Sequence, residues 1–497
     1  MSVAITDYAQ TPLAIIAAPA LAIDEGGARS GFRLLPEAHS AFQTRLELIQ
    51  LATRTLDLQY YLLQGDDTGR HLMRALSDAA ARGVRVRVLV DDLYTAGEDA
   101  LLTGLAAQPN VEVRLFNPFA SGRSSLLTRL LAAGPDLARV NRRMHNKLFV
   151  ADNVAALAGG RNIGDEYFMR SASSNFVDLD VFIVGPVVRD LSSTFDGYWN
   201  SDHAYPIATI VPTSLTRDES RAQFVQLTAH ASANAMTRPE PLLPEFAFLV
   251  SLPEELAQRK LNPLILGKAR VLVDPLTKTN GQNETSIEGT VHEAVVTWFR
   301  SAREEVFMVS PYFVPGAGGV AAMAEARKAG IHLVVYTNSL AASDEPLVNG
   351  AYARYRPEML KLGVELHEIS PTLTVKRKRL GFFGTSRGAL HVKMAIVDRK
   401  AMFLGSMNLD PRSATLNTEL GLIIESPELV AQIMPRMDRA SGYHVKLSSD
   451  GQSVEWIEED GDGDPRTNIV HHEEPETTTW LRFKVWLLSK FVPEGEL

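Results

Sequence analysis

Apolar and polar residues follow the same order of periods in two distant parts of the chain. In the first part, the spacing predicts a helix, a strand, a second helix and a second strand over residues 41–53, 56–61, 69–81 and 84–90. The second part repeats this order over residues 291–302, 306–310, 319–329 and 331–336. Because strands that alternate with helices form α/β units, we expect two similar α/β lobes. Each lobe is expected to have a mixed, mostly parallel sheet flanked by helices. A pseudo-two-fold axis is expected to relate the two lobes.

The stretches between and after these parts differ in composition. Residues 203–265 are rich in Pro, Ser and Thr and are interpreted as an inter-lobe linker. Beyond about residue 440 the chain predicts a hairpin over 445–457, an acidic loop and an apolar tail. The predicted division is an N-terminal extension, a first lobe, a linker, a second lobe and a C-terminal hairpin with an amphipathic tail, over residues 1–30, 31–202, 203–265, 266–440 and 441–497.

Composition excludes several classes of function. The 497 residues include 50 Lys and Arg against 59 Asp and Glu, a net charge of -9, which argues against a nucleic-acid partner because such proteins are usually basic. The chain has no cysteine. Disulfides, thiolate-ligated zinc, iron–sulfur clusters, thiol nucleophiles and a lipid-modified N-terminal cysteine are therefore excluded.

No segment approaches the roughly 20 apolar residues that a membrane-spanning helix needs. The apolar run over residues 13–22 is interrupted by Pro19 and has no Lys or Arg before it, so it does not fit a signal peptide. Unless a leader has been removed, we expect a cytosolic or membrane-peripheral protein.

One motif occurs once in each half of the chain. The segments HNKLFVAD at residues 145–152 and HVKMAIVD at residues 391–398 both fit H-x-K-x4-D. In each copy a Gly-rich turn leads to an asparagine, Asn162 or Asn408. A lone histidine is usually structural, but repetition of the whole motif favours a functional pair. The motif residues form the candidate catalytic set: His145, Lys147, Asp152, His391, Lys393 and Asp398.

The spacing within the motif predicts where its side chains point. If each copy begins a strand, His and Lys are two residues apart and project from the same face. Asp152 and Asp398 lie five residues beyond Lys, on the opposite face, so we interpret them as structural carboxylates that anchor a turn. Asn162 and Asn408 follow the next strand and are expected to return to the His/Lys face as substrate-binding amides.

Two imidazoles, two ammonium groups and two amides around one site suit a phosphodiester. One histidine would attack phosphorus to form a phosphohistidine. The other would protonate the leaving alkoxide and then activate the incoming water or alcohol. The lysines and asparagines would stabilise the equatorial oxygens. Neither copy of the motif has the carboxylate cluster of a magnesium site, so we expect no metal and no cofactor.

The duplicated motif resembles that of the phospholipase D superfamily. Its surroundings are similar to bacterial cardiolipin synthases, most of all to the C-type, over about residues 30–440. The segments that carry this likeness are LQYY at 58–61, NRRMHNK at 141–147, GGRNIGD at 159–165 and NLDPRS at 408–413.

This resemblance implies two phospholipase D-like lobes, an active site at their interface, a phosphatidyl-histidine intermediate and no cofactor. It also implies that a carboxylate downstream of each motif, Asp178 or Glu419, orients the histidine of the opposite half. The family has no single convention for the nucleophile, and we assign it to His145.

Two other segments suggest membrane contact. The first joins four cations to an aromatic pair and comprises Lys376, Arg377, Lys378, Arg379, Phe382 and Phe383. At a membrane, the cations would contact anionic headgroups and the rings would enter the interface. A solvent-exposed loop that contacts no membrane could have the same composition. The tail places Trp480 and Trp486 near Lys484 and Lys490, which suits an interfacial helix, the alternative being a terminal helix packed on the core.

The sequence therefore predicts a cardiolipin synthase-like phosphatidyltransferase. It would act peripherally at the bacterial inner membrane, on the cytoplasmic side because no signal peptide is present, with phosphatidylglycerol and possibly phosphatidylethanolamine as substrates. A helper protein is neither predicted nor excluded. Three alternatives stay open: a phospholipase D, which would use the same residues; a nuclease, which the acidic charge disfavours; and an inactive lipid-binding scaffold, which the intact His and Lys pairs disfavour.

Overall fold

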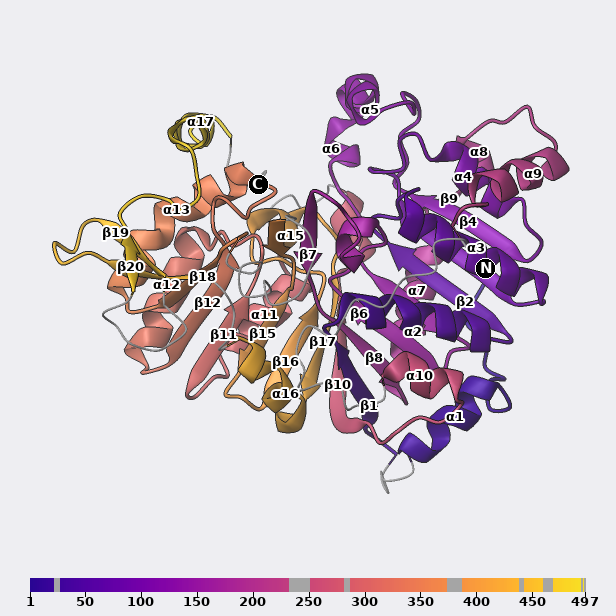
Figure 1. The fold of residues 1–497 in the computed structure, drawn as a ribbon, viewed down its shortest axis with the longest axis horizontal. Coiled ribbons are helices and arrows are strands. Elements are labelled where there is room, and N and C mark those ends of the chain that lie inside the picture. The colour runs from indigo at the N-terminus through magenta and orange to yellow at the C-terminus, as the bar shows by residue number, and fades with distance from the viewer. Residues whose placement is uncertain are drawn as a thin grey trace.

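The computed structural model describes residues 1–21, 27–231, 251–280, 287–372, 387–437, 442–458, 468–492 and 495. Figure 1 shows two α/β lobes side by side, the first in indigo and magenta and the second in orange and yellow. Helices flank the sheet of each lobe. The predicted fold of two similar α/β lobes is confirmed.

The first lobe is built on eight strands: β1 (Ser30–Leu35), β2 (Thr55–Tyr60), β3 (Arg85–Asp91), β4 (Val111–Phe116), β5 (Leu148–Ala151), β6 (Ala155–Gly159), β8 (Asp180–Val184) and β9 (Ala204–Pro206). Their order in the sheet is β9-β4-β3-β2-β5-β6-β8-β1. Its described helices are α1 (Pro12–Leu21), α2 (Ala38–Leu51), α3 (Asp67–Ala81), α4 (Asp99–Ala106), α5 (Leu126–Ala133), α6 (Leu137–Val140), α7 (Val187–Trp199), α8 (Ile207–Ile210), α9 (Arg217–Leu227) and α10 (Leu252–Ala257).

The second lobe repeats this plan with β10 (Ile265–Val273), β11 (Glu305–Val309), β12 (His332–Asn338), β13 (Glu365–Ile369), β15 (Met394–Val397), β16 (Ala401–Gly405), β17 (Leu420–Glu425), β18 (Gly442–Leu447), β19 (Val454–Glu458) and β20 (Ile469–His471). Their order is β10-β17-β16-β15-β11-β12-β13-β18-β19-β20. Its described helices are α11 (Val291–Phe299), α12 (Gly316–Lys328), α13 (Pro346–Lys361), α15 (Pro411–Thr415), α16 (Pro427–Met437) and α17 (Thr479–Leu488).

The sheets are mixed as predicted, but they are not mostly parallel. Parallel pairs occur within β2-β3-β4 and within β11-β12-β13, where helices make the connections. The other pairs of both sheets are antiparallel. The reason lies in the motif strands: β5 and β15 each turn back within a few residues into β6 and β16, and so short a connection permits only an antiparallel hairpin.

The predicted elements exist, with ends displaced by a few residues. The helices and strands of the first repeat correspond to α2, β2, α3 and β3, and those of the second to α11, β11, α12 and β12. The predicted C-terminal hairpin is formed by β18 and β19. Within the predicted linker over residues 203–265, the described part contains β9, α8, α9 and α10. The division into domains stays a prediction.

The two lobes share a buried apolar cluster and one continuous sheet. Strand β1 pairs antiparallel with β10, with Gly31 opposite Leu266. A buried cluster draws on both lobes, with Leu148 and Ala158 from the first and Met402 and Leu404 from the second. Because buried apolar surface holds the lobes together, groups placed at their interface are held in fixed positions.

Each motif strand ends in a left-handed turn held by the motif aspartate. Asp152 has a φ of 53° and Asp398 a φ of 52°. The buried Asp152 carboxylate accepts hydrogen bonds from the backbone N–H groups of residues 53, 54 and 55, at 3.0, 2.8 and 2.9 Å. Asp398 accepts the corresponding bonds from residues 303, 304 and 305. Each carboxylate therefore ties the end of a motif strand to the start of β2 or β11.

Replacing Asp152 with Ala is expected to destabilise the fold by about 2 kcal/mol, because three backbone donors next to a buried strand lose their acceptor. Asp398→Ala should cost less, since Asp398 is only partly buried whereas Asp152 is fully buried, and water can replace the Asp398 carboxylate. Urea unfolding followed by circular dichroism measures both. An Asp152→Ala protein as stable as the unchanged protein would contradict the anchoring role.

Candidate active site

Each motif histidine is held by the backbone of the opposite lobe. The N–H of His145 donates to the carbonyl of Thr418 at 2.8 Å, and the N–H of His391 donates to the carbonyl of Val177 at 2.8 Å. The preceding residues pair in the same manner. Met144 forms a parallel bridge with Thr418, while β14 (Arg387–Leu390) pairs in parallel with β7 (Ser174–Val177). The arrangement repeats across the pseudo-two-fold axis.

The ends of two parallel strands fix these segments from behind. Asp91, the last residue of β3, accepts a hydrogen bond from the N–H of Met144 at 2.8 Å and pairs with Arg143 at 3.0 Å. At the equivalent end of β12, Asn338 exchanges two hydrogen bonds with the backbone of Leu390, at 2.8 and 2.9 Å. The residue before each histidine is thus fixed on both sides.

Thr418 and Val177, which pair with the histidine backbones, are each followed in the chain by a residue with a carboxylate side chain. Glu419 follows Thr418 and its Oε2 lies 2.9 Å from His145 Nδ1, while Asp178 follows Val177 and its Oδ2 lies 2.6 Å from His391 Nδ1. Both carboxylates are buried. Because an ionised carboxylate only accepts, Nδ1 carries the proton of the neutral imidazole, and Nε2 keeps its lone pair.

Glu419 has further support that sequence reasoning missed. Its carboxylate accepts hydrogen bonds from the hydroxyls of Ser406 at 2.5 Å and Ser413 at 2.9 Å. The residue at the position of Ser406 in the first copy is Gly160, where a Cβ would come within 2.2 Å of Asp178 Oδ1. The sequence shows this difference between the two carboxylates' surroundings: the turn after the first motif has Gly159-Gly160, and the turn after the second has Gly405-Ser406.

The two lysines are buried and turn towards their own histidines. Lys147 Nζ donates to the carbonyl of His145, and Lys393 Nζ to that of His391, each at 2.7 Å. Burial lowers the pKa of Lys147 well below its usual range, and burial lowers that of Lys393 to about 8. The charges of Lys393 and Asp178 also act on Lys147, so the two motifs lie within electrostatic reach of each other. An anion bound between them would offset the cost of burying two ammonium groups.

The two histidine–carboxylate pairs are electrostatically unequal. Burial, followed by the charges of Lys147 and Lys393, lowers the pKa of His145 well below its usual value. Burial and Lys393 lower the pKa of His391 too, but Asp178 opposes them. Burial raises the pKa of Glu419 to about 6 against the opposing charge of Lys147. Burial also acts to raise the pKa of Asp178, but His391, Lys393 and Arg161 together outweigh it and the net shift is downward. His391 therefore holds a proton more readily than His145.

Aromatic rings and amides complete the surroundings. Tyr61 meets His145 edge-on at 4.8 Å between ring centroids, and Tyr167 meets His391 edge-on at 5.2 Å. Asn162 and Asn408, predicted to bind substrate, are buried, and the side-chain oxygen of each has no hydrogen-bond partner among the described residues. Sequence reasoning gave the tyrosines no role, although Tyr61 stands in the LQYY segment.

The predicted site residues fall into four groups. The structure brings together the motif His and Lys pairs with Asp178 and Glu419. Asp152 and Asp398 do not join them and bind the turns described above. Trp480 and Trp486 lie on α17, 71% and 55% exposed. The basic and aromatic residues predicted to contact membrane, Lys376, Arg377, Lys378, Arg379, Phe382 and Phe383, lie outside the described residues.

Comparison with known proteins identifies relatives. A family model described as "Cardiolipin synthase, PLD-like domain" matches residues 46–199 and 295–440. The chain is 38% identical to cardiolipin synthase C of Escherichia coli (strain K12), over 92% of this chain and 93% of that protein. It is 24% identical to cardiolipin synthase A of Pseudomonas fluorescens, over 82% of this chain and 67% of that protein. The crystal structure of phosphatidylserine synthase from Haemophilus influenzae Rd KW20 has the same fold, with a TM-score of 0.57 and 14% identity over 94% of this chain and 95% of that one.

The tautomer of the His145 imidazole should depend on whether the Glu419 carboxylate is ionised. At pH 7.5 we expect the nitrogen chemical shifts of a neutral imidazole protonated at Nδ1, measured by ¹⁵N NMR of histidine-labelled protein. As the pH falls through about 6, Glu419 gains a proton and stops holding that tautomer, so the His145 signal should change there. Glu419→Gln should abolish this transition. A His145 signal that titrates in the same way with and without the carboxylate would contradict the coupling.

Proposed function

This chain belongs to the cardiolipin synthase family of phospholipase D-like proteins, and from that premise we propose that it transfers a phosphatidyl group to phosphatidylglycerol. The observation that carries the proposal is the pair of buried histidines, each hydrogen-bonded through Nδ1 to a carboxylate of the opposite lobe. Such a pair supplies one nucleophile and one proton carrier at a single phosphodiester.

In the first half-reaction, His145 Nε2 attacks the phosphorus of the donor phospholipid. The bond between phosphorus and the headgroup oxygen breaks, and protonated His391 gives its Nε2 proton to that oxygen. The product is a phosphatidyl-histidine and a free headgroup alcohol. Lys147, Lys393, Asn162 and Asn408 stabilise the equatorial phosphate oxygens as charge develops.

In the second half-reaction, a headgroup hydroxyl of phosphatidylglycerol attacks the same phosphorus. His391, now neutral, takes the hydroxyl proton, and the bond between phosphorus and His145 breaks. The product is cardiolipin, and both histidines return to their starting states. Phosphatidylglycerol is proposed as acceptor and donor, with phosphatidylethanolamine as a second possible donor.

The roles of the two histidines follow from their electrostatics. The pKa of His145 lies well below its usual value because of burial and the two lysines, which favours the neutral nucleophile. His391 faces Asp178, whose pKa is lowered on balance by His391 itself, and this ionised carboxylate favours the imidazolium that an acid needs. These differences support His145 as the nucleophile.

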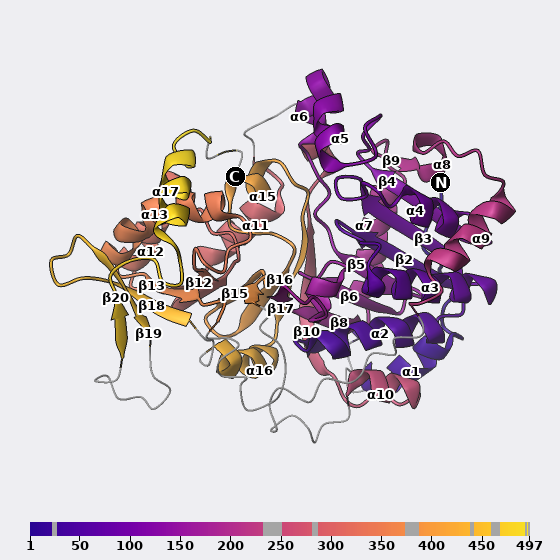
Figure 2. The ribbon, with the colours of Figure 1, turned by 45° about the horizontal axis from the view of Figure 1, so that its top comes forward.

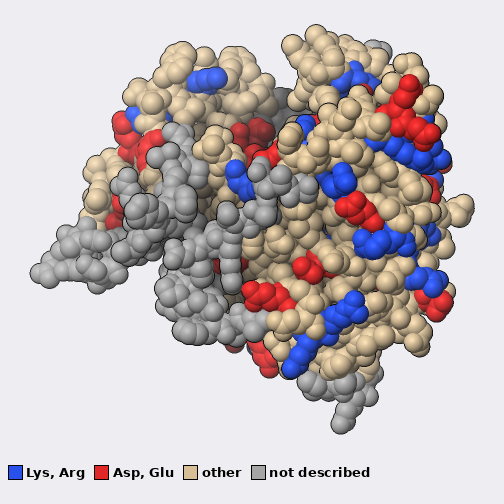
Figure 3. All heavy atoms as spheres, turned by 45° about the vertical axis from the view of Figure 1, so that its right-hand side comes forward, with Lys and Arg blue, Asp and Glu red and all other residues tan. Residues whose placement is uncertain are grey.

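The other functions considered differ in how well they fit. A phospholipase D would use the same residues with water as acceptor, so product analysis separates the two. A nuclease is disfavoured: on the face in Figure 3, basic and acidic side chains are interspersed and form no continuous basic stripe for a phosphate backbone. An inactive scaffold is disfavoured because both histidines retain their carboxylates.

A lipid substrate requires access to a membrane, and two helices are suited to that contact. No helix in the described part of the chain is long and apolar enough to cross a bilayer. Helix α17 packs on α13 through Val485 and exposes a face of aromatic rings, with Lys490 3.6 Å from the Trp486 ring. Helix α5 exposes leucines. The exposed side chains are Leu126, Leu127, Leu130 and Leu131 on α5 and Trp480, Phe483 and Trp486 on α17.

The two helices project from the same edge of the molecule. In Figure 1, α5 and α17 stand at the top of the view on either side of α15, and in Figure 2 they again lie on either side of α15, in the upper half of the view. The occupant that we propose for both apolar faces is the surface of an anionic bilayer, which rings and leucines can enter while Lys484 and Lys490 meet headgroups. The protein would then associate peripherally with the bacterial inner membrane.

The kinetic prediction concerns the histidines. His145→Ala and His391→Ala should each remove nearly all transferase activity without unfolding the protein, and the double variant should be no worse than the poorer single one, because both groups act in one covalent cycle. Cardiolipin formation is measured by lipid mass analysis with mixed micelles. A double variant far below either single variant would mean that the two residues act separately.

The proposed cations over the phosphate are Lys147 and Lys393, so no metal ion is needed there. We therefore expect cardiolipin formation at 25 °C to be unchanged in EDTA. Lys393→Met should lose activity that magnesium does not restore. Activity lost in chelator and regained with magnesium would show that the reaction requires a metal ion and would contradict the proposed role of the lysines.

Charged side chains on the exposed helices should weaken vesicle binding. Leu127→Glu with Leu131→Glu on α5, and Trp480→Glu with Trp486→Glu on α17, should each lower sedimentation with phosphatidylglycerol vesicles at least about tenfold, because two apolar side chains can no longer enter the interface. Turnover of a short-chain soluble phospholipid should stay unchanged. The control is Ile469→Glu on β20, an exposed apolar residue elsewhere. Equal losses in all three variants would contradict a binding edge formed by α5 and α17.

A further inference from the structure

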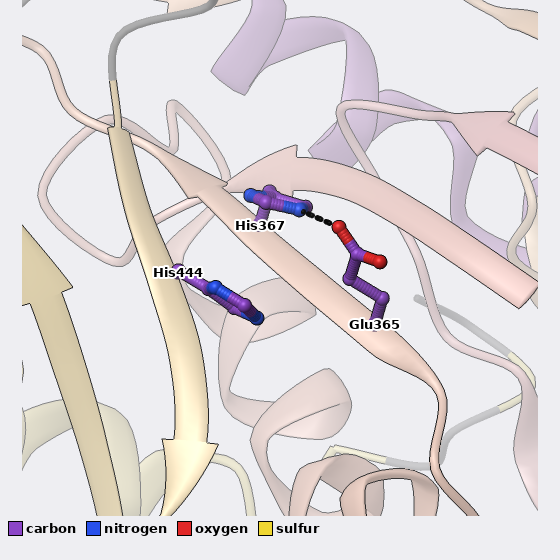
Figure 4. A group of neighbouring side chains, drawn as sticks. All are labelled: Glu365, His367 and His444. Carbon is purple, nitrogen blue, oxygen red and sulfur yellow. Dashed lines mark hydrogen bonds and ion pairs between the residues drawn. The ribbon is translucent and has the colours of Figure 1, made fainter. Parts of the chain in front are cut away.

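A second group of imidazoles and carboxylates lies in the second lobe, away from the catalytic histidines. Figure 4 shows Glu365 and His367 on β13 facing His444 on β18. One ligand atom from each of these three residues lies within 4.8 Å of the others. The Glu365 carboxylate and His367 Nε2 are 2.7 Å apart. All three side chains are partly buried, so solvent reaches them.

The sheet register creates this group. Glu365 and His367 are two residues apart on one strand and therefore share a face. His367 stands directly opposite His444 in the antiparallel pair of β13 and β18. The two rings stack at 4.8 Å between centroids with 24° between their planes, and Tyr336 stacks on the other side of His367 at 4.4 Å. Packing by Tyr336 limits the rotamers of His367.

A further pair of residues orients the carboxylate. His332, at the start of β12, has its Nε2 3.1 Å from the second oxygen of Glu365. Its Nδ1 lies 3.4 Å from Glu305 at the start of β11. Metal-binding carboxylates usually have such a hydrogen-bonded partner, which is in turn held by another group. The arrangement therefore offers two imidazoles and one oriented carboxylate on one solvent-accessible face.

We propose that Glu365, His367 and His444 bind a divalent transition-metal ion of the zinc type, with His332 orienting Glu365. Two imidazoles and a carboxylate are a common ligand set for Zn²⁺, with water in the remaining position. The ion would take the place of the contact between the Glu365 carboxylate and His367 Nε2 and draw the ring nitrogens of His367 and His444 towards one centre.

The proposed ion lies away from the active site and takes no part in the proposed reaction. Glu305, His332 and Glu365 are the first residues of β11, β12 and β13, whereas the active site forms beyond the opposite ends of the parallel strands, where Asn338 holds Leu390. The ion would join β13 to β18 and so fasten the hairpin of β18 and β19 to the lobe. This inference does not depend on the proposed reaction.

The test is Zn²⁺ binding to untagged, full-length protein from which metals have been removed with EDTA. Isothermal titration is expected to find one high-affinity Zn²⁺ per chain, and Co²⁺ in its place should give visible d–d absorption. Zn²⁺ should also raise the thermal midpoint, since a ligand of the native state opposes unfolding. Glu365→Gln and His367→Ala should each weaken Zn²⁺ binding at least about tenfold.

The matched control is His472→Ala, because His472 is an exposed histidine 3.3 Å from a glutamate but outside the proposed site. It should bind Zn²⁺ as the unchanged protein does. Glu365→Gln changes no side-chain volume and decides the question if His367→Ala fails to fold. Absence of saturable binding, or affinity retained in Glu365→Gln or lost in His472→Ala, would overturn the proposal. Cardiolipin formation after metal removal reports on the reaction separately.

Discussion

The exchange of hydrogen bonds between the lobes is the constraint on which the site depends. Each motif histidine takes its backbone partner and its carboxylate from the other lobe, from consecutive residues: Thr418 and Glu419, or Val177 and Asp178. Because one short segment fixes both the backbone and the ring, neither lobe can orient its own histidine alone. The shared core and the pairing of β1 with β10 hold the two halves in register.

Burial gives this arrangement its chemical character. Two lysines, two histidines and two carboxylates are removed from water, and that cost is high unless the charges compensate one another. Without a bound anion, the positive charges of the two ammonium groups are not fully compensated, as the lowered pKa values of both lysines indicate. A phosphate group supplies the missing negative charge. The site is therefore suited to a phosphodiester before any substrate arrives. Its halves differ in Asp178 against Glu419 and in Gly160 against Ser406, and in the proposed mechanism these differences distinguish the nucleophile from the acid.

Local patterns in the sequence predicted much of this. Helix and strand periods gave α2, β2, α3 and β3 and their repeats, and the duplicated motif gave the His and Lys pairs. The sheet was predicted to be mostly parallel because the periods show which elements exist and not which strands pair. Tyr167 and the group around His367 were missed for a related reason. Their partners are distant in the chain, and only strand register brings His367 opposite His444.

Trapping the covalent intermediate tests the central claim most directly. A phosphatidyl ester of p-nitrophenol has a leaving group that needs no proton, so His391→Ala should still release p-nitrophenolate once per active site. Without its base the variant should then accumulate the adduct. Mass spectrometry after alkaline quenching and proteolysis is predicted to find the phosphatidyl group on the peptide that contains His145. An adduct on another residue, or steady turnover without an adduct, would contradict the account.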